Sequence, residues 1–397
     1  MALPKTWLVV RLSALGDVVL TTGVLLWLHR TRGWRFVVLT RPQWAPVFRN
    51  HPAVDRVASM DPRDLRPAAL PGLVRSLAAT LPGAGLLDLH GTLRSRLLGA
   101  LWPGTVRRYP KFSLERRLFL RSGGRLFRER LRASNVTQRY TLAIQEAPPP
   151  RSALLPRILL DDAERERGLA LLREAGLLPA GTPIGTPDGA SGGASGGVSG
   201  GASAPLRPLV ALHPYSTHPD KAWLPDAWRD LAGHLSAAGY AWFVVGRSGG
   251  KGNAVAEAGD DEATPLSGFV EQTRLAGGLA ADFTDRTDLR ETCALLAAAD
   301  VLVTGDSGPM HLAAGVDTPV VALFGPTTRE WGFYPEGPRD VVLETGDACR
   351  PCSLHGSRRC AHSGRCMTGI APDAVFAAVR RVTGEEMAGK GAETETH

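Results

Sequence analysis

The sequence lacks an apolar run long enough to cross a membrane. Its longest N-terminal apolar stretch, Val18 to Leu28, is interrupted by two threonines and a glycine and falls short of the ~20 residues that a membrane span needs. A polar Gly16-Asp17 pair precedes it and no small-residue cleavage site follows, so neither a signal peptide nor a transmembrane helix is expected. With 44% hydrophobic and 21% charged residues, the composition is typical of a soluble globular protein.

Cysteine is scarce and unevenly placed. Cys293 stands alone, and the other four residues form the pattern Cys349-x2-Cys352-x7-Cys360-x5-Cys366. A secreted disulfide framework would spread its cysteines over a small domain, so this pattern favours a reducing cytoplasm. The four-cysteine cluster, with His355 and His362 inside it, has the ligand density of a structural zinc site. Free thiols are the alternative, and a catalytic metal is not expected.

Two nucleotide-binding fingerprints are also missing. No G-x-G-x-x-G follows the first apolar run, and no G-x-x-x-x-G-K-[ST] occurs anywhere in the chain. The dinucleotide dehydrogenase and P-loop classes therefore lose their main support.

The most informative stretch that is present runs from Val301 to Gly325. An apolar β-branched run ends at Gly305-Asp306-Ser307-Gly308, a small-residue helix follows, and Thr318 to Phe324 reads as a second buried strand. Ligands collect at the carboxyl ends of strands in such units, and amides at a helix start suit a phosphate. Ser307 and Gly308 are therefore candidates for a phosphate-binding turn. A simple serine N-cap is the alternative.

Short apolar runs alternate with helical segments on both sides of a low-complexity stretch. This alternation predicts an α/β fold with two doubly wound parallel sheets, in domains at 1–178 and 206–384. Residues 179–205 are almost entirely Gly, Ala, Ser, Thr and Pro, which predicts a flexible linker. Residues 385–397 are predicted to be a disordered tail.

Positive charge is concentrated between Arg94 and Arg139, where thirteen Arg and Lys residues face only two Glu. Such a region attracts nucleic acid, an acidic membrane surface or a phosphorylated substrate, although an Arg-rich solvated helix is the simpler alternative. Ser113 to Ala133 is predicted to be helical, and the spacing of Arg117, Arg121, Arg125 and Arg128 would place them on one helix face.

Polar turns after strands in both halves suit group transfer from a phosphate-activated donor. Asp17 follows the first strand and would act as a general base, although compensation of the helix dipole is an alternative role for it. Lys221 would neutralise a diphosphate leaving group, or would simply be solvated.

Several motifs together resemble one known family. They are Arg11-Leu-Ser-Ala-Leu-Gly-Asp17, the loop from His213-Pro214 to Lys221-Ala-Trp223, Gly305 to His311, and Leu323-Phe-Gly325-Pro-Thr327. The sequence resembles the heptosyltransferases of lipopolysaccharide core synthesis, glycosyltransferase family 9. That resemblance implies a GT-B fold with two Rossmann-like domains facing a cleft, and an inverting, metal-independent mechanism that needs no cofactor. It also implies an ADP-heptose donor and an anionic lipopolysaccharide acceptor at the cytoplasmic face of the inner membrane, with only peripheral membrane contact and no nucleic acid.

The resemblance also implies roles for individual residues. Asp17 matches the family's proposed base. The donor side is matched by Ser216, Thr217, Lys221, Asp306, Ser307, Gly308 and His311. The anionic acceptor would suit the arginine-rich region, with Arg94, Arg117, Arg121 and Arg125 as candidates.

Three departures from the family pattern concern specificity. Gly23 stands where the family often has Pro, and Tyr215 where many members have Gly. The segment after Gly246 lacks a Glu that some members use for the ribose. A transferase for another nucleotide sugar is therefore an alternative, and a non-catalytic, basic membrane-surface or nucleic-acid binding protein with a cysteine-rich module is another.

Overall fold

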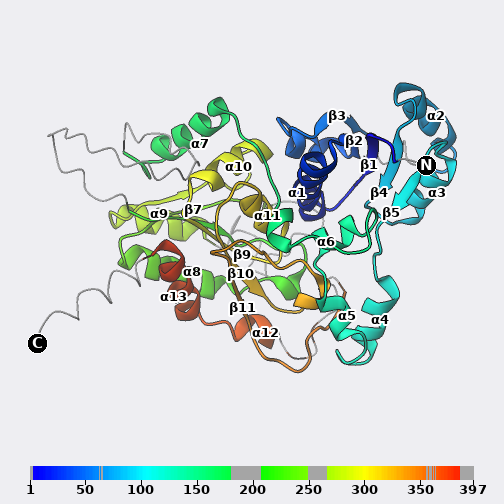
Figure 1. Ribbon diagram of the computed structural model, residues 1–397. Coiled ribbons are helices and arrows are strands. Elements are labelled where there is room, and N and C mark those ends of the chain that lie inside the picture. Colours follow the sequence, from blue (N-terminus) through cyan, green and yellow to red (C-terminus); the bar gives the residue numbers. More distant parts are fainter. Residues whose placement is uncertain are drawn as a thin grey trace, which may run out of the picture.

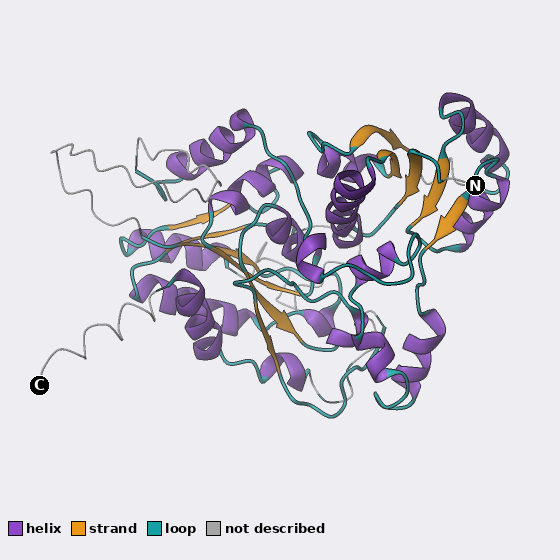
Figure 2. Ribbon diagram, viewed as in Figure 1, coloured by secondary structure: helices purple, strands orange, loops and turns teal. Residues whose placement is uncertain are grey.

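The computed structural model describes residues 3–61, 63, 66–179, 207–248, 266–354, 356, 360, 362 and 364–384. Two parallel sheets form the centres of two α/β halves, one from each half of the chain (Figure 1). Figure 2 shows helices around the strands of both halves. The predicted linker, apart from Pro179, and the predicted tail lie outside the described residues.

The N-terminal sheet has the strand order β3-β2-β1-β4-β5, and every neighbouring pair is parallel. Its strands are β1 (Thr6–Val10), β2 (Arg35–Thr40), β3 (Val54–Ser59), β4 (Gly85–Asp88) and β5 (Val106–Arg108). They alternate with α1 (Leu15–Arg32), the 3-10 helix η1 (Pro42–Phe48), α2 (Leu70–Thr80) and α3 (Leu93–Leu101). The chain reverses its direction of travel across the sheet between β1 and β4, and ligands bind at such a switch point.

The C-terminal sheet has the order β11-β10-β9-β6-β7-β8 and is also parallel throughout. Its strands are β6 (Leu209–His213), β7 (Ala241–Val244), β8 (Ala280–Asp282), β9 (Val301–Gly305), β10 (Val320–Phe324) and β11 (Val341–Glu344). Its helices are η3 (Pro219–Lys221), α8 (Pro225–Ala237), α9 (Ser267–Leu275), α10 (Leu289–Ala298), α11 (Gly308–Gly315), η4 (Arg329–Trp331), α12 (Arg365–Thr368) and α13 (Pro372–Thr383). The switch point here lies between β6 and β9. The predicted fold class is confirmed, because both halves are doubly wound parallel sheets.

The segment between the sheets is helical and corrects one prediction. It contains α4 (Ser113–Arg121), α5 (Arg128–Arg132), α6 (Val136–Thr141), η2 (Arg151–Leu154) and α7 (Asp162–Glu174). The expected continuous helix from Ser113 to Ala133 is wrong, because Gly123 and Gly124 both adopt left-handed conformations, with φ of 61° and 80°. Arg125 lies in the resulting turn and Arg128 begins the next helix, so the four arginines do not share one helix face.

The two halves are packed against each other. One hydrophobic cluster includes Trp7 of β1, Val19 of α1, Ala313 of α11 and Leu302 of β9. Helix α7, which precedes the linker in sequence, packs against α10 of the second sheet, and Gly168 lies too close to Ala294 to carry a side chain (Figure 1). No helix in the described part of the chain has both the length and the apolar character to cross a bilayer.

Two of the sequence departures have packing reasons. A side chain at Gly23 would overlap the backbone carbonyl of Leu155, so this helix position accepts only glycine here. Tyr215 is buried, and its hydroxyl lies 2.8 Å from the Thr284 hydroxyl while its ring packs against Gly246, where a Cβ would overlap it. Residues 249–265, which follow in this region, lie outside those described.

Candidate active site

Asp17 lies in the first turn of α1, immediately beyond β1 at the switch point of the first sheet. Tyr140 of α6 donates a hydrogen bond of 3.0 Å to its Oδ1, and the Arg11 guanidinium forms an ion pair with its Oδ2. Burial raises the pKa of Tyr140 well above its usual value, so the phenol stays protonated and remains a donor. The Asp17 carboxylate is therefore fixed from two sides while its side chain stays partly exposed.

Arg11 anchors this arrangement to the sheet. The residue is buried, donates to the backbone carbonyl of Leu89 beyond β4, and lies over the Tyr140 ring with 5.7 Å between its guanidinium carbon and the ring centroid. Burial opposes its charge, but Asp17 and Tyr140 outweigh that effect, so the pKa of Arg11 is raised. Arg11 thus links Asp17, which follows β1, to the backbone that follows β4.

Further cationic side chains approach Asp17 from the segment after β4 and β5. Tyr109 packs edge-on against Tyr140, with ring centroids 5.0 Å apart, and a Cβ at Gly91 would lie 3.4 Å from the Lys111 side chain. Burial lowers the pKa values of Lys111 and Arg116, whereas the nearby Asp17 charge raises both. The Nε of Arg116 is buried and has no hydrogen-bond partner among the described residues.

Asp306 occupies the turn after β9, at the switch point of the second sheet. Lys221 Nζ lies 2.6 Å from its Oδ2, and the Thr327 hydroxyl donates to the same oxygen at 2.8 Å. Burial alone would raise the pKa of Asp306, but Lys221 and Thr327 outweigh it, so the pKa is lowered. Lys221 is therefore already paired, rather than solvated.

Ser307 occupies the N-cap position of α11 without acting as a cap. Its side chain makes no capping bond; instead its hydroxyl lies 3.0 Å from that of Thr304 and 3.3 Å from Nδ1 of His213. Burial lowers the pKa of His213 to about 4, so this imidazole is neutral at pH 7. The simple N-cap alternative is therefore wrong, and the amides at the start of α11 have no side-chain cap.

The two candidate turns touch each other. A Cβ at Gly16 would overlap the His311 ring, and a Cβ at Gly308 would lie 2.9 Å from a methyl carbon of Leu15. Burial lowers the pKa of the His311 imidazole, whereas the charges of Asp306 and Asp17 raise it. His311 is thus placed between the two carboxylates, and the start of α1 faces the start of α11.

The remaining predicted residues lie at varied positions. The Ser216 hydroxyl closes a local turn by donating to the His218 carbonyl at 2.9 Å, and Thr217 is exposed beside it. Arg94, Arg117, Arg121 and Arg125 are exposed on α3, on α4 and in the α4–α5 turn. Within the arginine-rich region, Arg116, the neighbour of Arg117 on α4, interacts electrostatically with Asp17.

The segment that carries the cysteine cluster adjoins the donor-side turn: a Cβ at Gly356 would overlap the Lys221 side chain, and the Arg350 guanidinium donates to the Thr327 carbonyl at 3.0 Å. All five thiols are free, and no three His, Cys, Asp or Glu side chains among the described residues are arranged to hold a metal ion; His355 lies outside that set. Burial and the neighbouring thiols raise the pKa of Cys352 to about 12, so this side chain is a protonated thiol at pH 7. The structural zinc stays a prediction.

Sequence reasoning missed Tyr140, which orients Asp17, and Tyr109, which packs against Tyr140, because both come from segments far along the chain and no local motif marks them. Lys111 was counted in the arginine-rich region without a role of its own. Arg116 lies inside the arginine-rich region but could not be distinguished from its neighbours, because a local excess of arginine does not indicate which side chains point toward the protein interior.

Comparison with known proteins finds similarity to glycosyltransferases in part of the chain. Residues 194–359 match the family described as glycosyltransferase family 9 (heptosyltransferase). Lipopolysaccharide heptosyltransferase 2 of Salmonella typhimurium is 33% identical over 126 residues, which cover 32% of this chain and 33% of that protein. Lipopolysaccharide heptosyltransferase 1 of Pseudomonas aeruginosa is 34% identical over 150 residues, 36% of each chain. The chain thus aligns with about a third of the length of these relatives.

Solved structures match over nearly the whole chain. A glycosyl transferase family 9 protein from Veillonella parvula has a TM-score of 0.68 at 16% identity, covering 97% of this chain and 99% of that one. The Escherichia coli ADP-heptose lipopolysaccharide heptosyltransferase II has a TM-score of 0.63 at 19% identity, covering 96% and 99%. These likenesses establish a GT-B architecture of two facing Rossmann-like domains.

Proposed function

We propose, on the premise that residues 194–359 match glycosyltransferase family 9, that the chain transfers heptose from ADP-heptose to the inner core of lipopolysaccharide. One observation carries the proposal: the Asp17 turn and the Ser307-Gly308 turn, each at the switch point of its own sheet, are in contact through Gly16 and His311. A base and an anion-binding helix start are then close enough to act on one glycosyl group.

In the proposed reaction Asp17 accepts the proton of the acceptor hydroxyl as that oxygen attacks the anomeric carbon. The bond from that carbon to the diphosphate breaks, and the leaving group carries away the electron pair. Attack from the face opposite the leaving group inverts the anomeric centre. Tyr140 and Arg11 hold the Asp17 carboxylate in place through the reaction.

The departing diphosphate is proposed to bind on the second domain. The uncapped amides of α11, at Gly308 and beyond, supply partial positive charge, and Ser216, Thr217 and Lys221 line the neighbouring loop after β6. Asp306 holds Lys221 in that loop. This charge compensation needs no cofactor.

The acceptor is proposed to approach from the first domain. Lys111 and Arg116 interact electrostatically with Asp17 and would hold an anionic group of the acceptor beside the attacking hydroxyl. The exposed Arg94, Arg117, Arg121 and Arg125 would attract the same anionic molecule from a greater distance. The place of action would be the cytoplasmic face of the inner membrane, reached by peripheral contact.

Turnover with defined substrates tests the proposal. The purified protein is incubated with ADP-heptose and an inner-core acceptor, and ADP release and the product mass are measured together. An increase in acceptor mass by one heptose, matched to ADP released, is expected. Turnover with a UDP- or GDP-sugar but not with ADP-heptose would favour the alternative transferase. Binding of anions without turnover of any nucleotide sugar would favour the non-catalytic alternative.

A further inference from the structure

The corner formed by α4, the turn from Ser122 to Phe127, and α5 exposes apolar side chains to solvent. Leu114, Leu126 and Phe127 are 65%, 53% and 39% exposed. Phe127 also adopts a left-handed conformation with φ of 63°, which is uncommon for a bulky residue. We call Leu114 to Arg130 the basic corner.

Charge in the basic corner is only partly compensated. Arg130 pairs with Glu115 at 3.4 Å, and Arg128 lies 3.9 Å from Glu330. For Arg117, Arg121 and Arg125, no carboxylate in the described part of the chain lies within ion-pair distance. These three exposed guanidinium groups lie on α4 and in the turn that carries Leu126 and Phe127.

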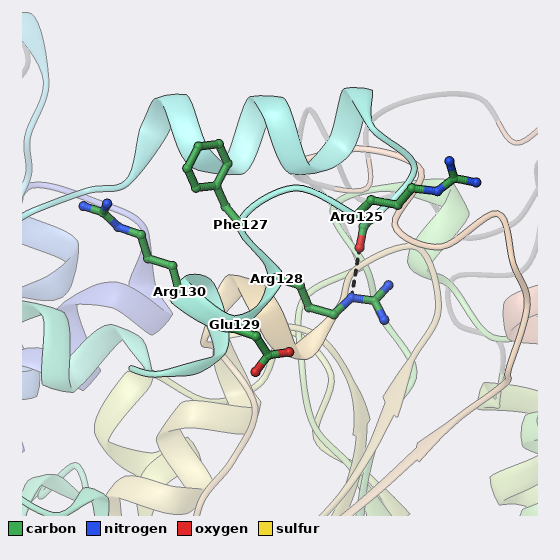
Figure 3. A pocket seen from close by; sticks show the side chains of 6 residues that line it. Arg125, Phe127, Arg128, Glu129 and Arg130 are labelled. Carbon is green, nitrogen blue, oxygen red and sulfur yellow. Dashed lines mark hydrogen bonds between the residues drawn. The ribbon is translucent and has the colours of Figure 1, made fainter.

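The turn also forms a small basic hollow. A pocket of about 500 Å³ is lined by Gly124, Arg125, Phe127, Arg128, Glu129 and Arg130. Figure 3 shows the arginine side chains spread around the turn, with Phe127 among them; Arg128 Nε donates to the backbone carbonyl of Gly124 at 2.9 Å. Such a hollow can receive the charged head of a lipid.

We infer that the basic corner docks on an anionic phospholipid bilayer, with Leu126 and Phe127 at the acyl boundary and Arg117, Arg121 and Arg125 among the headgroups. Two exposed apolar side chains in a turn whose neighbouring arginines have no carboxylate partner among the described residues complement that surface in both polarity and charge. The inference rests on the proposed function, because an acceptor anchored in a bilayer brings the enzyme to a membrane.

The position of the basic corner relative to the candidate active site supports this occupant. Helix α4 carries Arg116 inward, where the guanidinium lies 4.9 Å from the centre of the Trp331 ring and interacts with Asp17. The next residue, Arg117, is exposed. One helix therefore connects the lipid-facing surface to the groups around Asp17, so docking would bring the base toward an acceptor at the membrane.

Vesicle binding tests the inference on the full-length protein. Flotation is measured with vesicles of phosphatidylcholine alone and with vesicles containing phosphatidylglycerol. The wild-type protein is expected to float only with the anionic vesicles. The variant Leu126→Ser/Phe127→Ser should bind about tenfold more weakly, and Arg117→Ser/Arg121→Ser/Arg125→Ser about 100-fold more weakly, since each arginine near such a surface contributes about fivefold. Leu275→Ser, at a leucine 80% exposed on α9, is the matched control and should bind like wild type.

Two acceptor forms separate the docking surface from the reaction. Leu126→Ser/Phe127→Ser should keep the wild-type kcat on a lipid-free soluble acceptor and show a raised KM only for the acceptor embedded in vesicles. Equal vesicle binding by wild type and both variants would overturn the inference. So would loss of binding in Leu93→Ser/Leu97→Ser, on the exposed face of α3, with the basic corner variants unaffected. A wild-type protein that binds anionic vesicles but transfers no sugar would instead contradict the proposed function alone.

Discussion

The ion pair between Lys221 and Asp306 combines a structural and a functional role, and Lys221→Met tests both. The two side chains are 13% and 15% exposed, so removing the lysine leaves a largely buried carboxylate whose remaining hydrogen-bond donor among the described side chains is Thr327. Breaking a buried pair in this way costs about 3 kcal/mol, the lower end of the usual range because some solvent contact remains. For a domain of this size, such a loss lowers Tm by roughly 6–12 °C at pH 7.

The sign of the pH dependence follows from the pKa of Asp306. In the wild type this pKa is lowered from 3.8, so the pair's contribution to stability is present above the unfolded-state value and is lost as pH falls through the folded-state value. In Lys221→Met, burial dominates and raises the pKa of Asp306. The stability difference between variant and wild type should therefore be largest at pH 7 and shrink toward pH 4, where the carboxyl group becomes protonated.

A second substitution separates the two roles of Lys221. Lys221→Met/Asp306→Asn removes the unpaired charge and should recover most of the lost Tm, measured by thermal unfolding at pH 7. Its kcat/KM for the donor should stay about 10²-fold below wild type, because the cation beside the diphosphate is still missing. Recovery of turnover together with Tm would refute a role in leaving-group stabilisation, and an unchanged Tm in Lys221→Met would refute the buried-pair argument.

Three further outcomes are expected. Tyr140→Phe removes one hydrogen bond to Asp17 and should lower kcat about tenfold in steady-state assays, with donor KM unchanged; a larger effect on donor KM than on kcat would contradict its positioning role. Gly308→Ala places a Cβ 2.9 Å from Leu15 and should raise donor KM several-fold, whereas Leu15→Ala/Gly308→Ala should restore it; no restoration would argue against the contact as the cause. Cys349→Ser/Cys352→Ser should leave kcat unchanged and lower Tm only if elemental analysis finds bound zinc, and a kcat that follows added zinc at constant Tm would overturn the metal-independent mechanism.

Several strands and the turns that follow them could be predicted, because short apolar runs indicate buried strands and small polar residues indicate turns. Val301 to Gly325 indicated strand, turn, helix and strand, and the structure has β9, α11 and β10 there. The helix predicted from Ser113 to Ala133 is too long, because the spacing of the arginines continues past Gly123 and Gly124. The left-handed backbone conformations of these two glycines end the helix there. Short or partly exposed strands such as β5 and β8 gave too little pattern to detect.

Some residues of the candidate site could also be predicted from the sequence, and others could not. Asp17 lies in the first turn of α1, and Asp306 and Ser307 lie between β9 and α11; polar residues that closely follow a buried strand are informative at such positions. Tyr140 and Arg116 act through contacts made only when α6 and α4 fold back toward the first sheet. Their roles depend on tertiary packing, so the sequence alone contained no signal that separates them from neighbouring residues.

The central claim is that Asp17 is the base of a glycosyl transfer, and Asp17→Asn tests it most directly. This change keeps the side-chain size but removes basicity. Asp226→Asn is the matched control, because Asp226 also lies in the first turn of a helix, α8, and is exposed there. Turnover and donor affinity are measured on the same preparations, by product mass and by titration calorimetry. We expect kcat of Asp17→Asn to fall by roughly 10²- to 10⁴-fold with donor affinity nearly unchanged, and Asp226→Asn to match wild type. Near-normal turnover in a folded Asp17→Asn protein would contradict the claim and leave Asp17 only the role of a helix-start charge.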